Sequence, residues 1–539
     1  MIKDILSKTL VINVIILFVI IGFSSNITAI VHQDNTREYR VQFLKYDITD
    51  NSDYNYRSSQ LRYRYMTKDG KIQIITKPTN RFPLEETQYN EKEKPLFIPI
   101  DTGEGNHLPI HINGNENFTY DNGVTSGSGT ENDPFIIENW IIVGNGSVKR
   151  AIYVRNTNNY FIIRNCTTSN FLGWGHMGIE FRNVENGKIE HTEMYNNHYG
   201  VFMTDTSYVE IVNCTSHDNY GEYATGIRGI QCSNIKIITC KCYNSTSPGY
   251  VAFGIHFEKG NYIFIENTWV YNNEDVGIDI FTDDSTNYPC IYNTIKDCKI
   301  YDNLRSGGIV LWSTSREKHK GYNLITGCEI YNNGHWPEPV DNADPGITIW
   351  NLNNNIIENC DIHHNGDGIK ITLCSNNIIR NCNIHDNWQP GFMGNGVIIM
   401  GWETDGLLGI SWNNAIEHCN IYNQDCGIWN TEGLNTKIYK NNISDNKYVG
   451  IEVSNFLGIS SAKINYNNIC GNGYLDEDGY GLSGYPISFI DACNNWWDSE
   501  KGPSRLLFPN RGDRLVKIVS MVQFRPWLTE PINDAGVQE

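Results

Sequence analysis

Four polar residues in a repeated sequence pattern could together form an acid–base site. Arg228, His256 and Asp279 occupy the same position in three successive repeats. Glu258 lies two residues after His256, on the same face of an extended chain. If the repeats stack, Asp279 would orient one imidazole nitrogen of His256 while the other nitrogen faces a substrate. Arg228 would then pair with a uronate carboxylate or with negative charge that develops during the reaction.

Two classes of chemistry fit this set of residues, and a structural explanation competes with both. A polysaccharide lyase or epimerase neutralises a carboxylate and removes the neighbouring proton, which suits Arg, His and Asp together. A glycoside hydrolase needs two carboxyl groups about 5 to 10 Å apart, a task that Asp279 and Glu258 fit less naturally. The structural alternative is that a solvent-facing column of polar positions holds charged residues at random.

Tryptophans gather on the same side of the predicted repeats. Trp312 and Trp350 occupy one outward position on consecutive repeats and would form a platform for the C–H groups of sugar rings. Lys370 belongs to the adjacent outward column. The long loops beside these columns hold three further candidates, Trp336, Trp388 and Trp402. Loops grouped along one side of a rigid scaffold are typical of a binding groove, although exposed aromatic residues also simply cover neighbouring strands.

All of these positions depend on one repeated unit, a glycine followed by a branched apolar residue, any residue and a second apolar residue. Clear copies are GIEF at Gly178, GVFM at Gly200, GIHF at Gly254, GIDI at Gly277, GIVL at Gly308, GITI at Gly346, GIKI at Gly368, GVII at Gly396 and GIEV at Gly450. Alternating apolar residues predict short strands with one face inward, and no stretch is long enough for a helical crossover. Such strands cannot bury their apolar faces alone, so about 12 units must stack into a solenoid.

Two further columns fit this stacking. Turn asparagines would form amide ladders and tolerate left-handed backbone angles. Cysteines that recur once per unit beside inward Ile lack the paired spacing of a zinc site, so we interpret them as small buried apolar residues, with disulfides between adjacent coils as the alternative. The columns are Asn219, Asn273, Asn303, Asn333, Asn365, Asn387 and Asn446, and Cys166, Cys214, Cys240, Cys298, Cys328, Cys360, Cys382 and Cys419.

The start of the chain fits a targeting segment followed by a stalk. Residues 9–23 form an apolar run that is shorter than the ~20 residues of a typical membrane span. Small residues that follow it offer a cleavage site, so both a secreted protein and a protein anchored by this segment fit. The predicted divisions are 1–29 signal peptide or signal anchor, 30–106 stalk or N-terminal extension, 107–150 N-terminal cap, 151–490 β-helix and 491–539 C-terminal cap and tail.

The charge balance of the chain limits its partners. The sequence holds 61 Asp and Glu against 42 Lys and Arg, for a net charge of −19. This disfavours a nucleic-acid partner, which requires a cationic surface. It also disfavours polyanionic substrates unless a divalent cation such as calcium bridges the charges. The sequence predicts no metal site, because the acidic runs at 283–284 and 476–478 lack the spacing of an EF-hand loop.

The repeated units and the two ends of the solenoid resemble a known group of proteins. The GI-x-I and I-x-N-C units, the opening GVTSGSGTENDPFIIENW and the closing NNWWD and FRPWL are similar to parallel β-helix repeat proteins of the NosD-like and pectate-lyase-like superfamily, known for carbohydrate-binding and sugar-hydrolysis domains. The resemblance implies an all-β fold, a single-stranded right-handed parallel β-helix with N- and C-terminal caps. Copper is sometimes associated with the NosD-like name, but this sequence has no Met, His and Cys cluster to support it.

This fold hosts lyases, hydrolases, epimerases, binding proteins and structural proteins, so it implies function only broadly. We expect a secreted or membrane-tethered surface protein that binds a polysaccharide or cell-envelope glycan in a loop-rimmed groove, with cleavage or epimerisation as a further step. Only the N-terminal segment would contact a membrane. The alternative is a non-enzymatic structural or adhesive protein of the cell envelope. Convergence of Arg228, His256 and Asp279 in a cleft favours an enzyme, and splayed or covered side chains favour the alternative.

Overall fold

The computed structural model describes four short N-terminal segments and most of the chain from residue 105. The described residues are 27–33, 39–45, 60–66, 72–78 and 105–538, without 250, 284–289, 315–318, 336–343, 389–392, 405–406, 456–459, 475–478, 485–487, 506–511 and 518–519. The chain divides into two compact units, Met1–Leu96 and Phe97–Glu539.

The first unit contains two antiparallel hairpins. Strand β1 (Ile27–Gln33) pairs with β2 (Tyr39–Lys45), and β3 (Gln60–Met66) pairs with β4 (Ile72–Pro78). Residues 1–26 of the predicted leader lie outside the described residues, and the division of the first 106 residues into leader and stalk stays a prediction. Within the described part of the chain, no helix is long and apolar enough to span a membrane.

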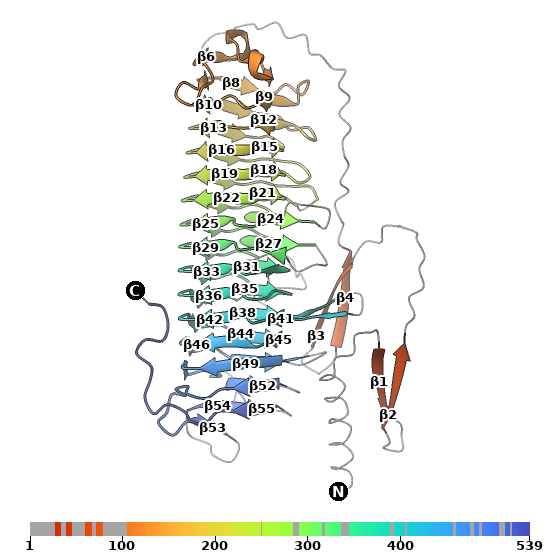
Figure 1. The fold of residues 1–539 in the computed structure, drawn as a ribbon, viewed down its shortest axis with the longest axis vertical. Helices are drawn as coiled ribbons and strands as arrows, with labels where there is room; N and C mark the ends of the chain where they lie inside the picture. The colour runs from red at the N-terminus through yellow and green to blue at the C-terminus, as the bar shows by residue number, and fades with distance from the viewer. Residues whose placement is uncertain are drawn as a thin grey trace. The chain divides into compact units, whose positions relative to one another are not determined.

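The second unit is a right-handed parallel β-helix, as the sequence predicts (Figure 1). Three sheets run along it, and each coil away from the two ends contributes one strand to each sheet. Neighbouring strands are parallel, except that β6 is antiparallel to β7. Sheet 1 has the order β5 (Ile110–Asn113), β9 (Arg150–Thr157), β12 (Met177–Val184), β15 (Tyr199–Thr204), β18 (Thr225–Ile230), β21 (Phe253–Glu258), β24 (Ile278–Thr282), β27 (Ile309–Ser313), β31 (Pro345–Trp350), β35 (Asp367–Thr372), β38 (Asn395–Met400), β44 (Cys426–Thr431), β48 (Val449–Ser454), β51 (Tyr480–Gly484), β54 (Gly512–Lys517) and β53 (Pro503–Ser504).

Sheets 2 and 3 complete each coil. Sheet 2 has the order β6 (Val124–Ser126), β7 (Phe135–Glu138), β10 (Phe161–Arg164), β13 (Gly187–Glu190), β16 (Ser207–Val212), β19 (Ser233–Ile238), β22 (Asn261–Glu266), β25 (Thr294–Lys296), β29 (Leu324–Thr326), β33 (Ile356–Glu358), β36 (Ile378–Arg380), β42 (Ala415–Glu417), β46 (Thr436–Tyr439), β49 (Ser460–Asn465), β52 (Ser488–Asp491) and β55 (Met521–Gln523). Sheet 3 has the order β8 (Ile141–Val143), β11 (Thr167–Ser169), β14 (Glu193–Tyr195), β17 (Thr215–His217), β20 (Lys241–Tyr243), β23 (Trp269–Tyr271), β26 (Lys299–Tyr301), β30 (Glu329–Tyr331), β34 (Asp361–His363), β37 (Asn383–His385), β43 (Asn420–Tyr422), β47 (Asn442–Ser444) and β50 (Asn468–Cys470).

Short 3-10 turns and two-stranded pairs lie outside the three long sheets. Two 3-10 turns precede β6, and three two-stranded pairs lie in the loops. These elements are η1 (Asn115–Asn117), η2 (Tyr120–Asn122), and the pairs β28 (His319–Lys320) with β32 (Leu352–Asn353), β39 (Trp402–Thr404) with β40 (Leu407–Gly409), and β41 (Ser411–Trp412) with β45 (Gly433–Leu434).

The inward faces of the three sheets form one long apolar core, and the repeated glycine lets them approach closely. In β21, Ile255 and Phe257 point inward and are fully buried. A Cβ at Gly254 would lie 2.2 Å from Cγ1 of Val270, which belongs to β23 of sheet 3. The glycine that opens each GI-x-I unit therefore reflects close packing of sheet 1 against sheet 3, where any side chain would clash.

The predicted asparagine ladder is present and buried. Asn303 donates from Nδ2 to Oδ1 of Asn333 at 2.9 Å, and Asn333 donates likewise to Asn365 at 3.0 Å. The left-handed backbone angle does not belong to this position, so that part of the expectation was wrong. It belongs to the preceding turn residue, such as Asn332 with φ of 53°, because the ladder residue itself must point its amide inward.

The cysteines confirm the interpretation as small buried apolar residues. None of the fifteen forms a disulfide, so the alternative of disulfides between coils was wrong, and every member of the predicted column is buried. Burial raises the pKa of Cys232 to about 12, which keeps this thiol neutral.

Candidate functional site

Sheet 1 places three of the four predicted polar residues in direct register. Arg228 on β18 pairs with His256 on β21, and His256 pairs with Asp279 on β24. The Arg228 position depends on Gly229, which breaks the apolar pattern. The ring of Phe257 fills the space beside Gly229. A Cβ added at Gly229 would lie only 2.4 Å from this ring. The neighbouring coil thus compensates for the glycine and keeps Arg228 in its column.

His256 and Asp279 form a pair that a tryptophan completes. Nδ1 of His256 lies 2.9 Å from Oδ2 of Asp279, at ion-pair distance but without hydrogen-bond geometry. The other carboxylate oxygen, Oδ1, accepts a 2.8 Å hydrogen bond from Nε1 of Trp312 on the following coil. Trp312 therefore fixes one oxygen of Asp279, and the other oxygen faces His256. This arrangement orients the imidazole ring of His256.

Aromatic rings enclose this pair. The centroid of the His256 ring lies 4.5 Å from that of Phe253 and 5.7 Å from that of Phe281. His256 is only 5% exposed and Asp279 only 4%. The expectation of a solvent-facing polar column was therefore wrong for these two residues, because the large side chains beside them exclude water.

Arg228 turns away from the pair. Its Nη1 donates a 2.9 Å hydrogen bond to the hydroxyl of Tyr199, and its guanidinium carbon lies 5.3 Å from the centroid of that ring. The centroid of Phe202 lies 5.8 Å away on the same side. The structure thus brings together His256 and Asp279, while Arg228 contacts the preceding coil, and a shared role for all three stays a prediction.

Glu258 belongs to a separate charged group at the end of β21. It is 4% exposed, and its Oε1 lies 3.7 Å from Nζ of Lys259. The same ammonium lies 3.5 Å from Oδ2 of Asp283. Glu258 is therefore partly neutralised, and its use with Asp279 as a carboxyl pair stays a prediction.

The predicted aromatic platform begins one coil earlier than expected. Trp312 pairs in register with Trp350 on β31 and with Phe281 on β24. The rings of Phe281 and Trp312 are stacked with centroids 4.8 Å apart and planes 18° apart. We call Phe281, Trp312 and Trp350 the aromatic column. Phe281 could have been found from the sequence, since it occupies the same outward position as the two tryptophans.

The remaining predicted binding residues are dispersed. Lys370 on β35 is half-buried, with Thr348 and Ile398 beside it in register. Trp388 is 45% exposed, and Nζ of Lys447 lies 5.0 Å from its ring centroid. Two predicted tryptophan side chains lie outside the described residues, Trp336 and Trp402, although the backbone of Trp402 belongs to β39.

Sequence reasoning missed two buried carboxyl groups where the strands of sheet 1 begin. Burial, together with the negative charges of Asp344 and Asp279, raises the pKa of Asp275 to about 7. Burial also raises the pKa of Asp367 to about 6, against two hydrogen bonds that Asn395 donates to its Oδ1. Both groups change charge near neutral pH, which is common at functional sites. In the sequence they look like ordinary turn residues.

The candidate site contains no metal centre that the described residues could form. In that part of the chain, no group of three or more His, Cys, Asp or Glu side chains could hold a metal ion. Most of the acidic runs at 283–284 and 476–478 lies outside the described residues. Calcium as a bridge to an anionic substrate therefore stays a prediction.

Comparison with solved structures finds chains with low similarity to this one. The A-module of the mannuronan C-5 epimerase AlgE6 of Azotobacter vinelandii is 14% identical, covers 72% of this chain and 88% of its own, and has a TM-score of 0.39. The periplasmic alginate epimerase AlgG is 13% identical over 78% and 85% of the two chains, with a TM-score of 0.39. The Dettilon tailspike protein gp208 is 12% identical over 67% and 62%, with a TM-score of 0.40. At these values no substrate or residue role is transferred to this chain.

The sequence itself matches one family. No curated protein matches the chain. The family described as "Right handed beta helix region" matches residues 110–289, 220–333 and 290–399, which together run over more than half of the 539 residues. This match agrees with the parallel register of all three sheets and with the resemblance that the repeated units carry. The chain therefore belongs to the right-handed parallel β-helix family.

Proposed function

We propose that this protein binds a polysaccharide along sheet 1, with the sugar rings on the aromatic column and the His256–Asp279 pair as the acid–base group beside it. The observation that carries the proposal is the hydrogen bond from Trp312 to Asp279, which joins the platform to the pair. A sugar ring on Trp312 would lie two coils from His256, whereas a sugar ring on Phe281 would lie one coil from it, which is about 4.8 Å along the solenoid. This is the distance at which a side chain reaches a bound ligand.

The chemistry that suits this site is proton transfer at a sugar carbon or a glycosidic oxygen. Asp279 orients the imidazole, and His256 would remove or deliver the proton. Epimerisation or β-elimination of a uronate fits such a group, and neutralisation of the uronate carboxylate would fall to Arg228 after a change of rotamer or to a bridging calcium ion. We place the protein outside the cytoplasm, where it is either secreted after cleavage of the segment that contains the apolar run at residues 9–23 or anchored to the membrane by that run.

A structural or adhesive role is the second candidate, and one observation favours it. His256 and Asp279 are almost fully covered, so a substrate reaches them only if the aromatic side chains around them, Phe253 and Phe281, move. In that case the pair would stabilise the stacked coils, and the aromatic column would serve for adhesion or only for packing.

The test is a comparison of two histidine–aspartate pairs in the same molecule. His256→Gln removes the proposed acid–base group, and His385→Gln removes a matched pair on sheet 3, where Nε2 lies 3.1 Å from Oδ1 of Asp361. We expect the first variant to lose about 100-fold or more of any lyase, epimerase or hydrolase turnover on uronate and neutral polysaccharides, with and without calcium. The second variant should keep it. Equal loss in both, or no turnover by the wild-type protein, would contradict the catalytic part of the proposal.

Binding is tested separately with two tryptophans. Trp312→Ala removes the centre of the aromatic column, and Trp269→Ala removes a 42% exposed tryptophan on sheet 3. We expect at least a tenfold loss of polysaccharide affinity in the first variant, about 1.4 kcal/mol, and none in the second. If the wild-type protein binds none of the polysaccharides, the structural role is the better explanation.

A further inference from the structure

Sheet 3 carries a continuous stack of rings on its outer face. Nine aromatic side chains from nine successive coils lie ring over ring, with centroids 4.8 to 5.4 Å apart and planes within 12° of each other. We call them the ring stack: Tyr195, His217, Tyr243, Tyr271, Tyr301, Tyr331, His363, His385 and Tyr422. Each inner ring is covered on both faces by its neighbours, so the faces within the stack are not available to a ligand.

The ring stack stops at Tyr422, and the column continues with small side chains. Tyr422 on β43 pairs in register with Ser444 on β47, which pairs with Cys470 on β50. One face of the Tyr422 ring packs on His385 at 4.8 Å. The other face looks along the column toward two positions that hold no ring.

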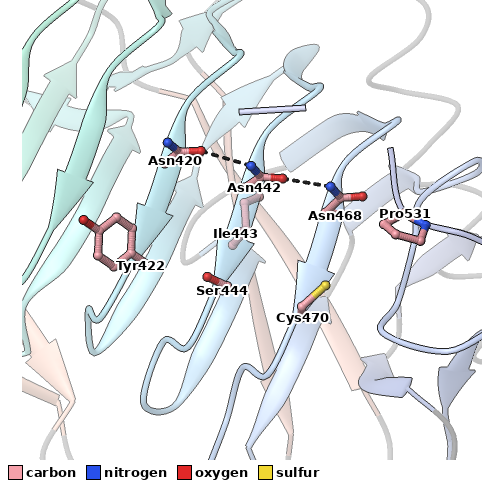
Figure 2. A pocket seen from close by; sticks show the side chains of 8 residues that line it. All are labelled: Asn420, Tyr422, Asn442, Ile443, Ser444, Asn468, Cys470 and Pro531. Carbon is pink, nitrogen blue, oxygen red and sulfur yellow. Dashed lines mark hydrogen bonds between the residues drawn. The ribbon is translucent and has the colours of Figure 1, made fainter. Parts of the chain in front are cut away.

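A cavity occupies the place of the missing rings. Its volume is about 320 Å³, within the range of small-molecule sites. It is lined by Asn420, Tyr422, Asn442, Ile443, Ser444, Asn468, Cys470 and Pro531, and Figure 2 shows Tyr422, Ser444 and Cys470 on successive strands. None of these side chains is charged. The lining thus combines one aromatic face, two hydroxyls and a row of amides with the apolar ring of Pro531, while the side chain of Ile443 is buried in the core.

The amide row is held in a fixed geometry beside the cavity. Asn442 donates from Nδ2 to Oδ1 of Asn420 at 3.1 Å, and Asn468 donates to Oδ1 of Asn442 at 2.8 Å (Figure 2). Each amide oxygen keeps a second lone pair, and the hydroxyl of Ser444 can donate or accept. Polar groups are therefore ordered before any ligand arrives, which lowers the entropic cost of binding.

The C-terminal tail forms the far wall. The backbone of Ile532 exchanges two hydrogen bonds with the Asn468 amide, at 2.8 and 3.0 Å. Asn442 donates a 3.1 Å hydrogen bond to the carbonyl of Ala535, and Asp534 forms an ion pair with Lys440. These contacts fix Pro531 against the column, so the cavity is closed at one end by the tail and at the other by Tyr422.

We propose that this cavity binds one uncharged sugar ring, stacked on the open face of Tyr422 in the place of the next ring of the stack. The C–H groups of a pyranose pack on an aromatic face, and its hydroxyls match the amide oxygens and Ser444. An uncharged lining disfavours a uronate, which would be desolvated without a counter-charge. The thiol of Cys470 adds no chemistry, because burial raises its pKa to about 12 and keeps it protonated. The site is on sheet 3 and does not depend on the function proposed for sheet 1.

The experiment fills the cavity with the chain's own missing ring. Ser444→Tyr extends the ring stack by one position, and Ser444→Ala keeps the space open as the matched control. Binding of neutral methyl pyranosides and of N-acetylglucosamine to the full chain is followed by saturation-transfer NMR and calorimetry, with a uronic acid and phenol as comparison probes. We expect a neutral pyranoside to bind the wild-type protein, to bind Ser444→Ala about threefold more weakly because one hydroxyl partner is lost while the space stays open, and to bind Ser444→Tyr at least tenfold more weakly.

A second pair of variants covers the case in which Ser444→Tyr folds poorly. Tyr422→Ser removes the platform, and Tyr301→Ser removes a ring inside the stack whose faces are covered by Tyr271 and Tyr331. Binding should be lost in the first variant and kept in the second. Unchanged binding in Ser444→Tyr and Tyr422→Ser, binding of phenol or the uronic acid alone, or no binding of any neutral sugar overturns the proposal.

Discussion

At the scale of single residues, the two oxygens of Asp279 have different tasks. Oδ2 faces the imidazole of His256 at 2.9 Å, and Oδ1 accepts the indole N–H of Trp312 at 2.8 Å. A carboxylate held in this way can orient a histidine without itself exchanging a proton. Trp312 thereby has two separable contributions, since its ring packs on Phe281 and its N–H positions Asp279.

Trp312→Phe separates these contributions. The variant keeps a ring for stacking but removes the donor to Asp279, so we expect polysaccharide affinity to fall less than threefold. Turnover should fall about tenfold or more, because a hydrogen bond to a charged group contributes about 1.5 to 3 kcal/mol to its positioning. The split between KM and kcat measures this, with Trp269→Phe on sheet 3 as the control. A parallel loss of affinity and turnover would show that Trp312 acts through its ring alone.

At the scale of elements, the buried asparagine ladder holds the turns of successive coils together. The amide of Asn333 donates to the carbonyl of Ile300 at 2.9 Å and to Asn365 at 3.0 Å, and it accepts from Asn303 at 2.9 Å. These groups are buried away from water, so they need the hydrogen-bond partners that the ladder supplies. The residue before it, Asn332, makes the turn itself with φ of 53°.

Neighbouring asparagines should therefore respond differently to substitution. Asn333→Gly leaves buried donors and acceptors unpaired and should destabilise the protein by about 3 kcal/mol. Asn332→Gly, on the exposed turn, should change stability by less than about 0.5 kcal/mol, because glycine adopts the left-handed angle freely. Urea unfolding and hydrogen exchange at β26, β30 and β34 report both effects. Similar losses in the two variants would mean that the turn angle and not the ladder stabilises the coil.

The repeat made much of this architecture predictable, because in a solenoid the equivalent residues of adjacent repeats pair with each other on adjacent strands. The same position in adjacent units placed His256 beside Asp279 and Trp312 beside Trp350. The direction of Arg228 could not be predicted in this way, since its partner Tyr199 lies at a different position of the preceding coil.

Burial of the outward column was likewise hidden from the sequence. Alternation says which side chains leave the core, but it does not say which of them large neighbours cover. Phe253 and Phe281 exclude water from His256 through their size and rotamers. Asp275 was missed for a related reason, because its burial and its raised pKa come from the packing of a turn that looks polar in the sequence.

At the scale of the whole molecule, each ladder of buried asparagines must end at the last coil. One of these ladders ends at a carboxyl group, that of Asp513. Oδ2 of Asp513 on β54 accepts from the backbone N–H of Asn472 at 3.1 Å and from its Nδ2 at 2.8 Å, where the next coil would otherwise supply an asparagine. Burial raises the pKa of Asp513 to about 7 despite these hydrogen bonds. The C-terminal coil is thus closed by a group that is neutral in mild acid and charged above neutrality.

The stability of this end should therefore fall as the pH rises. A carboxyl whose folded pKa lies above its unfolded value of about 3.9 binds more protons when folded, so its contribution is complete below pH 4 and is lost by about pH 7. Asp513→Asn keeps the acceptor and removes the charge. We expect it to match the wild-type melting temperature at pH 4 and to exceed it at pH 8, while Asp445→Asn, at an exposed turn, changes neither. A difference of equal size at both pH values would mean that the end of the ladder stays uncharged throughout, and that its acid serves only as an acceptor for Asn472.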